Sequence, residues 1–149
     1  VVKERFGAGS RAIGLGLDRA QALAHATGLE EPIFQPFMTG LEFSVDAWVD
    51  SDFKVKGLVL RRRDMVVNGE SQVTTTFSDD ALEDGALIVI EALQLRGPLV
   101  LQAIVDESGS MHVIECNARF GGASTTGIAA GVDSLFWSLL EARGINVGT

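Results

Sequence analysis

The stretch GPLVLQAIVDESGSMHVIECNARFGG, residues 97–122, decides the fold. Two apolar runs, at 99–105 and 111–116, flank a four-residue polar segment at 107–110. Apolar runs separated by a short loop containing Gly and Ser are typical of an antiparallel hairpin. A hairpin closed by this loop pairs Asp106 with Met111, and the same register sets Gln102 directly opposite Glu115.

Three oxygen-bearing side chains converge on one face of this predicted hairpin. Side chains alternate between the two faces of a strand, so Glu115 and Asn117 point one way and Cys116 points the other, toward a core. Directly opposed residues have Cβ atoms roughly 4.5–5.5 Å apart. Gln102 is therefore expected beside Glu115 and Asn117.

Hard oxygen ligands of this kind suit Mg²⁺, which takes one or two carboxylates and leaves its other positions to water and phosphate oxygens. Arg119 and the turn Gly121-Gly122 follow the strand at once. We therefore predict a site for Mg²⁺ that carries phosphates, with Mn²⁺ as an alternative metal. The competing interpretation is an ordinary amphipathic hairpin with a solvated polar face.

Composition limits the class of protein. With 149 residues, 46% of them hydrophobic and 21% charged, the chain is expected to fold as one soluble globular domain. The net charge of −8 argues against general nucleic-acid binding. No apolar run approaches the 18 or so residues of a membrane span. The single cysteine forms no internal disulfide, which favours a cytoplasmic location.

The positive charges are clustered within this acidic chain, at residues 3–5, 11, 61–63 and 119, which indicates a local anion site. Arg61 and Arg63 share a strand face by alternation and could clamp a substrate carboxylate; the alternative is that they decorate an exposed strand end.

The chain begins Val-Val-Lys, without a methionine, and we expect it to be a piece of a longer polypeptide.

Patterning places the remaining elements. Strands are predicted at 1–6, 31–37, 42–49, 53–61 and 65–77, and helices at 18–27, 78–96, 123–130 and 133–143. Asp18 and Gln21 form a capping box. The glycine loop at 7–11 would let backbone N–H groups approach phosphate, and Pro36 marks an edge or a hinge.

Four features follow one another along the chain: the strand lysine, the glycine loop, the proline hinge and the terminal E-x-N-x-R. With these features in this order, the chain resembles the ATP-grasp superfamily. The closest resemblance is to its carbamoyl-phosphate-synthase-like branch, through ECNARFGG and the upstream Gln102. It covers nearly all of the chain but only the later part of that fold. It implies an α+β fold with a mixed, mostly antiparallel sheet packed with helices. Residues 1–36 would be part of the smaller lid subdomain, and 37–149 the C-terminal subdomain with the metal and phosphate site.

The resemblance also implies residue roles. Lys3 and Arg119 would act at the transferred phosphate, and Gln102, Glu115 and Asn117 would be the metal ligands. The residues expected to bind the nucleotide are Lys3, Gly7, Gly9, Ser10, Gln35, Pro36, Phe37 and Glu42. The substrate-side candidates are Arg61, Arg63, Gly121, Gly122 and Ser124. The synthase's phosphate-side histidine has no counterpart near Val67, so its carboxyphosphate chemistry is not carried over.

The function implied is that of an ATP-dependent ligase that joins a carboxylate to an amine or similar nucleophile through an acyl phosphate. ATP and Mg²⁺ would be the cofactors. Expected partners are the two small-molecule substrates, the missing N-terminal part of the same enzyme and, as a further candidate, a second copy in a homodimer; no nucleic acid or membrane is expected. The isolated piece would be inactive. The alternative function is a non-catalytic nucleotide-binding module.

Overall fold

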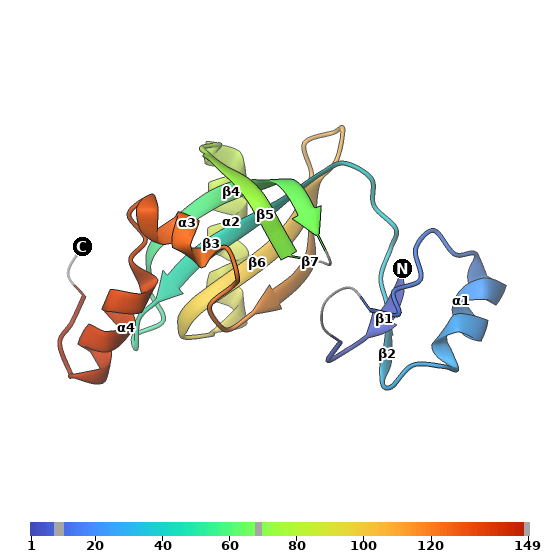
Figure 1. Cartoon of the computed structure of the whole chain (residues 1–149), viewed down its shortest axis with the longest axis horizontal. Coiled ribbons are helices and arrows are strands. Elements are labelled where there is room, and N and C mark those ends of the chain that lie inside the picture. Colours follow the sequence, from blue (N-terminus) through green and yellow to red (C-terminus); the bar gives the residue numbers. More distant parts are fainter. Residues whose placement is uncertain (8–10, 68–69, 148–149) are drawn as a thin grey trace.

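The computed structural model describes residues 1–7, 11–67 and 70–147, and shows a small two-stranded sheet beside a five-stranded sheet (Figure 1). An N-terminal unit consists of β1 (Val2–Glu4), α1 (Arg19–Ala26) and β2 (Pro32–Phe34). The large sheet has the order β5-β4-β3-β6-β7, formed by Glu70–Phe77, Val55–Val67, Leu41–Val49, Gly97–Val105 and Met111–Asn117. The remaining helices are α2 (Asp80–Leu93), α3 (Ser124–Ala129) and α4 (Ser134–Ala142).

The α+β fold is thus confirmed, with one correction to the sheet. Every pairing between the described strands is antiparallel, so the sheet is not mixed. Strand β4 also runs on to Val67, past the predicted end at residue 61. Arg61 therefore lies where β4 is paired on both sides, and Arg63 is paired with β5 inside the same strand, so neither lies at an exposed strand end.

The main core lies between one face of the large sheet and α2. Apolar residues alternate along the three central strands, and those on this face meet Leu82, Ala86 and Ile90 of the helix. Asp79 caps α2 through Leu82 N, and Gln94 in the left-handed conformation ends it, so the helix is shorter than predicted. Cys116 packs against this core as expected, and burial raises the pKa of its thiol, with a smaller contribution from the charge of Glu115.

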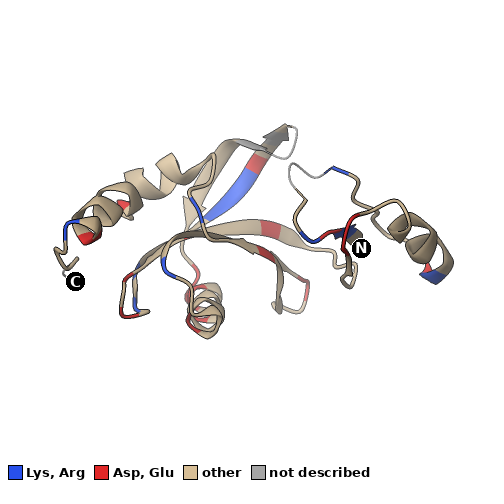
Figure 2. Ribbon diagram, turned by 90° about the horizontal axis from the view of Figure 1, so that it is seen from below, with Lys and Arg blue, Asp and Glu red and all other residues tan. Residues whose placement is uncertain are grey.

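The opposite face is covered at one end by α3 and α4, so helices lie on both sides of the sheet (Figure 2). Buried Trp48 forms an edge-to-face contact with Trp137 at 5.7 Å between ring centroids and donates from Nε1 to Ser138 Oγ at 2.9 Å. Asp133 caps α4, as its spacing predicted. The part of this face that lies beyond α3 is polar.

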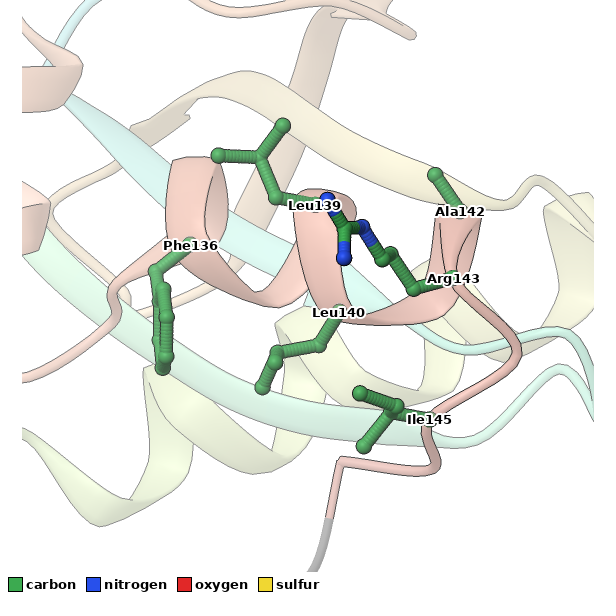
Figure 3. Close-up of a pocket in the computed structure, with 6 residues that line it drawn as sticks. All are labelled: Phe136, Leu139, Leu140, Ala142, Arg143 and Ile145. Carbon is green, nitrogen blue, oxygen red and sulfur yellow. The ribbon is translucent and has the colours of Figure 1, made fainter.

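Helix α4 leaves an apolar hollow of about 490 Å³ on its outer side, at the end of the molecule away from β1 (Figures 1 and 3). Its lining residues are Phe136, Leu139, Leu140, Ala142, Arg143 and Ile145. Among the described residues, no helix is long and apolar enough to span a bilayer.

The hairpin of β6 and β7 differs from its prediction by one residue at the loop. Val105, and not Asp106, pairs with Met111, yet Gln102 does pair with Glu115. Both are possible because a β-bulge follows Gln102, where Ala103 pairs with Val113 and Ile114 is the extra residue. The predicted opposition of Gln102 and Glu115 is confirmed because the bulge compensates for the shifted loop.

Asp106 instead organises the hairpin loop. Its carboxylate accepts hydrogen bonds from the Ser108 hydroxyl at 2.6 Å, from His112 Nε2 at 2.6 Å and from the Ser110 amide at 3.1 Å. These contacts hold the pKa of Asp106 far below its usual value of 3.8, and the Ser108 hydroxyl makes the largest contribution. Hydrogen bonds to the ionised form favour that form.

Acid should therefore weaken the hairpin loop through Asp106. A lowered pKa contributes stability that is fully present above the unfolded value near 3.8 and is lost as pH falls from there toward the folded pKa. We expect Asp106→Asn to be less stable than wild type at neutral pH, and the difference to shrink below pH 3.8. Thermal unfolding across pH measures it, with Glu107→Gln as control. A difference that does not change with pH would contradict the assignment.

Gly40, just before β3, has no room for a side chain. Its φ is +156°, and an added Cβ would lie 2.1 Å from the carbonyl oxygen of Val105. We expect Gly40→Ala to lower the free energy of unfolding by about 3 kcal/mol, because overpacking of about 1–3 kcal/mol joins the backbone strain. Urea denaturation measures it. Gly109→Ala is the control, at φ +83° with nothing within 4 Å of the added Cβ, and should lower the free energy of unfolding by only about 1–2 kcal/mol. Equal losses in the two variants would show that contact with the Val105 carbonyl does not destabilise Gly40→Ala.

Candidate functional site

The bulge in β7 brings the N-terminal unit to the hairpin. The carbonyl oxygen of Ile114 accepts hydrogen bonds from Lys3 Nζ at 3.2 Å and from Gln35 Nε2 at 3.0 Å. A bulged residue falls outside the regular ladder, so its backbone groups can bind elsewhere. Gln35 is itself held by reciprocal backbone bonds with Val1. Lys3 and Gln35, two predicted nucleotide-binding residues from opposite ends of the N-terminal unit, thus donate to the same carbonyl oxygen.

The three predicted metal ligands lie on the same polar face, as the register requires. Gln102 pairs directly with Glu115, and Asn117 Nδ2 donates to Glu115 Oε1 at 2.9 Å. The other carboxylate oxygen, Oε2, lies 3.5 Å from Lys3 Nζ. Glu115 is 42% exposed, whereas Lys3 is only 11% exposed. The carboxylate is therefore open to solvent on one side and faces a buried cation on the other.

This donor set fits Mg²⁺ by its chemistry. Gln102 and Asn117 offer amide oxygens and Glu115 offers one carboxylate, which are the hard ligands that this ion takes beside water and phosphate. Within residues 1–7, 11–67 and 70–147, no three His, Cys, Asp or Glu side chains gather at a metal-binding distance. A metal ion bound here would thus need phosphate oxygens to neutralise much of its charge, unlike an ion that is held by protein ligands alone.

Next to these ligands, Arg63 forms an ion pair with Glu42, and its Nη1 lies 3.5 Å from Gln102 Oε1. The sheet order explains this contact, since β3 lies between β4 and β6 and carries Glu42 on the shared face. Glu42 and Arg63, predicted separately to bind the nucleotide and the substrate, are therefore direct neighbours. Arg63 is 10% exposed and Glu42 is 43% exposed.

Arg61 does not lie where a substrate clamp needs it. Its Nε donates to Asp46 Oδ2 at 2.6 Å, and its Nη2 lies 3.4 Å from Oδ1. Both side chains are buried, at 4% and 6% exposure. A buried charge requires a partner, so the guanidinium serves Asp46 and the proposed pairing of Arg61 with Arg63 as a clamp is corrected. Asp46 was missed, although an aspartate in the middle of an apolar strand is itself a signal of such a partner.

Asp46 also connects to the glycine turn that follows the metal ligands. Ser124 Oγ lies 3.4 Å from Asp46 Oδ1 and accepts from the amide of Gly121 at 2.8 Å. Ser124 is buried, so its hydroxyl points into the protein and not toward an open substrate surface. Farther along β3, Ser44 Oγ is buried with no hydrogen-bond partner among the described residues. Ser44 pairs with Arg61 on one side and Gln102 on the other.

The other predicted site residues lie mostly at exposed positions. Phe37 is 53% exposed and Gly7 is exposed. Arg119 is exposed; its guanidinium donates to the neighbouring Phe120 carbonyl at 3.0 Å, and its amide donates to the Asn117 carbonyl at 2.9 Å. Pro36 follows the end of β2, and Gly122 lies in the turn before α3 with nothing within 4 Å of an added Cβ. Gly9 and Ser10 lie outside the described residues.

Solved structures share this fold. The biotin carboxylase domain of Hydrogenobacter thermophilus 2-oxoglutarate carboxylase, a dimer in complex with MgADP, ADP and bicarbonate, has a TM-score of 0.76 at 16% identity, over 99% of this chain and 37% of its own. Campylobacter jejuni biotin carboxylase gives 0.62 at 15%, over 77% and 28%. Staphylococcus aureus N5-carboxyaminoimidazole synthetase with ADP gives 0.55 at 15%, over 86% and 35%.

The chain therefore spans about a third of the length of the structures it matches. No curated protein sequence matches it. A family model described as "ATP-grasp in the biosynthetic pathway with Ter operon" matches residues 29–148, which include both the predicted hinge segment and the hairpin that carries the predicted metal ligands. The superfamily inferred from ECNARFGG is confirmed, and its carbamoyl-phosphate-synthase-like branch stays a prediction. The chain belongs to the ATP-grasp family described by that model.

Proposed function

We propose that the chain supplies the metal and phosphate side of an ATP-dependent ligase that joins a carboxylate to an amine or a related nucleophile. Bound MgATP would supply the phosphoryl group that activates the carboxylate as an acyl phosphate, which the nucleophile then opens with release of phosphate. Phosphoryl transfer of this kind depends on positioning and charge neutralisation more than on covalent chemistry from the protein.

The chain's own residues would divide this work. Gln102, Glu115 and Asn117 hold the metal, and Lys3 and Arg119 neutralise charge on the phosphates. Gln35, Pro36 and Phe37 lie along the base, and Glu42 binds the ribose. On the substrate side, the proposal keeps Arg63 and the turn at Gly121 and Gly122, of which Gly122 is exposed. Arg61 and Ser124 support the site from within.

One observation carries this proposal: the contact of Lys3 and Gln35 with the Ile114 carbonyl, which sets the expected phosphate and base contacts directly beside Glu115. Lys3 lies 111 residues from Ile114 in the chain, and Gln35 lies 79 residues from it. A purely structural hairpin has no need of a solvent-exposed carboxylate between two amides and a buried lysine. The nucleotide complexes of the matched structures support ATP as the ligand class.

The test is an assay of a protein that carries this chain together with the remainder of an ATP-grasp fold. ADP release from MgATP that requires both a carboxylate and an amine, with the condensed product identified by mass spectrometry, is the expected result. Panels of amino acids and small carboxylic acids serve as the first substrates. Tight nucleotide binding without ADP release under any combination would favour the non-catalytic module instead.

A further inference from the structure

The contact between Lys3 and Glu115 gives the site an internal cation. We propose that the Lys3 ammonium neutralises Glu115 while no metal is bound, and that a divalent metal displaces it and thereby frees it for phosphate. The inference rests on the proposed function, because it assumes that Glu115 is a metal ligand. It adds a regulation to that site: metal binding promotes the phosphate contact of Lys3.

The geometry favours exchange over coexistence. Lys3 Nζ lies 3.5 Å from Glu115 Oε2 and 3.2 Å from the Ile114 carbonyl oxygen, so two oxygens already surround one positive charge. A divalent ion bound to Glu115 would bring two further charges within a few ångströms of the ammonium. Like charges at that separation repel each other. The lysine and the metal therefore compete for the same carboxylate.

Release of Lys3 does not require the N-terminal unit to leave the hairpin. Gln35 Nε2 donates to the same Ile114 carbonyl at 3.0 Å and is neutral, so a metal does not repel it. Only the lysine side chain has to move. Each ligand therefore assists the other: metal frees Lys3 for the phosphates, and phosphates that hold Lys3 leave Glu115 to the metal, as linkage requires.

The first arm of the test measures Mn²⁺ binding to this chain, without nucleotide, by electron paramagnetic resonance of the free ion. The variants are Lys3→Met, which keeps the apolar stem, and Glu115→Gln, which keeps the shape. We expect Lys3→Met to bind Mn²⁺ about three- to tenfold more tightly than wild type, and Glu115→Gln to lose the site. Lys56→Met is the matched control and should bind as wild type does, since Lys56 is 16% exposed and pairs with Asp50 at 3.4 Å.

The second arm separates displacement from a general effect of charge. Acetylation of lysine amines, followed by mass spectrometry, should modify Lys3 slowly in the metal-free protein and faster as Mg²⁺ is added, while Lys56 does not change. In Glu115→Gln, Lys3 should react quickly with or without Mg²⁺. Calorimetry of each variant with Mg²⁺ establishes the saturating concentration.

The outcomes distinguish the inference from the function beneath it. Metal binding that depends on Glu115 but leaves Lys3 acetylation and the Lys3→Met affinity unchanged would overturn the exchange and keep the metal site. No binding that depends on Glu115 in any variant, Lys3→Met included, with ADP present as well as without it, would overturn both. Faster acetylation of Lys3 together with tighter binding by Lys3→Met would support both.

Discussion

Asp46→Ala should lower the free energy of unfolding by about 3–5 kcal/mol, the range for removal of one partner from a buried ion pair. The variant leaves the Arg61 guanidinium at 4% exposure without its bond at 2.6 Å. It also removes the acceptor beside Ser124, which supports the turn at Gly121. Urea denaturation followed by far-ultraviolet circular dichroism measures the change.

Asp64→Ala, on the neighbouring strand β4, is the matched control. Asp64 pairs with Arg62 at the same N–O distance of 2.6 Å, but that pair is solvent-exposed. Exposed pairs contribute little because water screens them, so Asp64→Ala should shift the urea midpoint far less than Asp46→Ala. Similar shifts for the two variants would show that burial does not determine the role of Asp46. The double variant Asp46→Leu/Arg61→Leu should recover much of the stability, since an apolar pair leaves no uncompensated charge.

Glu115→Ala is expected to weaken magnesium-dependent nucleotide binding by about 100-fold or more, because loss of a supporting residue alone costs roughly 10–100-fold at metal sites. Calorimetric titration with ADP, with and without Mg²⁺, measures it in a protein with a complete ATP-grasp fold. ATP-dependent turnover should fall with it. Retention of the magnesium effect would exclude Glu115 as a ligand.

Glu107→Ala, in the loop of the same hairpin, is the control for a change in charge alone. Both substitutions remove one carboxylate from the β6–β7 hairpin, but Glu107 lies in the loop and not opposite Gln102. Nucleotide binding to Glu107→Ala should keep its dependence on magnesium. Loss in both variants would indicate a general electrostatic effect and not coordination.

Much of the local structure could be predicted because its causes lie within a few residues. The Asp18 and Gln21 capping box forms as written, and Asp133 caps the last helix. Boundaries were less accurate: the predicted strand at 1–6 is only Val2–Glu4, since pairing with β2 ends there. The end of α2 also differs, because the helix predicted to run to residue 96 ends at Leu93, which is 43% exposed.

The sequence by itself determined the alternation that puts Gln102, Glu115 and Asn117 on one face, because alternation is a property of any extended strand. It could not determine the bulge at Ile114, since a register shift depends on the competition between loop geometry and strand pairing. Only the tertiary structure decided that this carbonyl accepts Lys3 and Gln35 and that Arg61 is buried against Asp46. Those contacts require the strand order that places β3 between β4 and β6, and the packing of the N-terminal unit against β7. No local pattern encodes either of them.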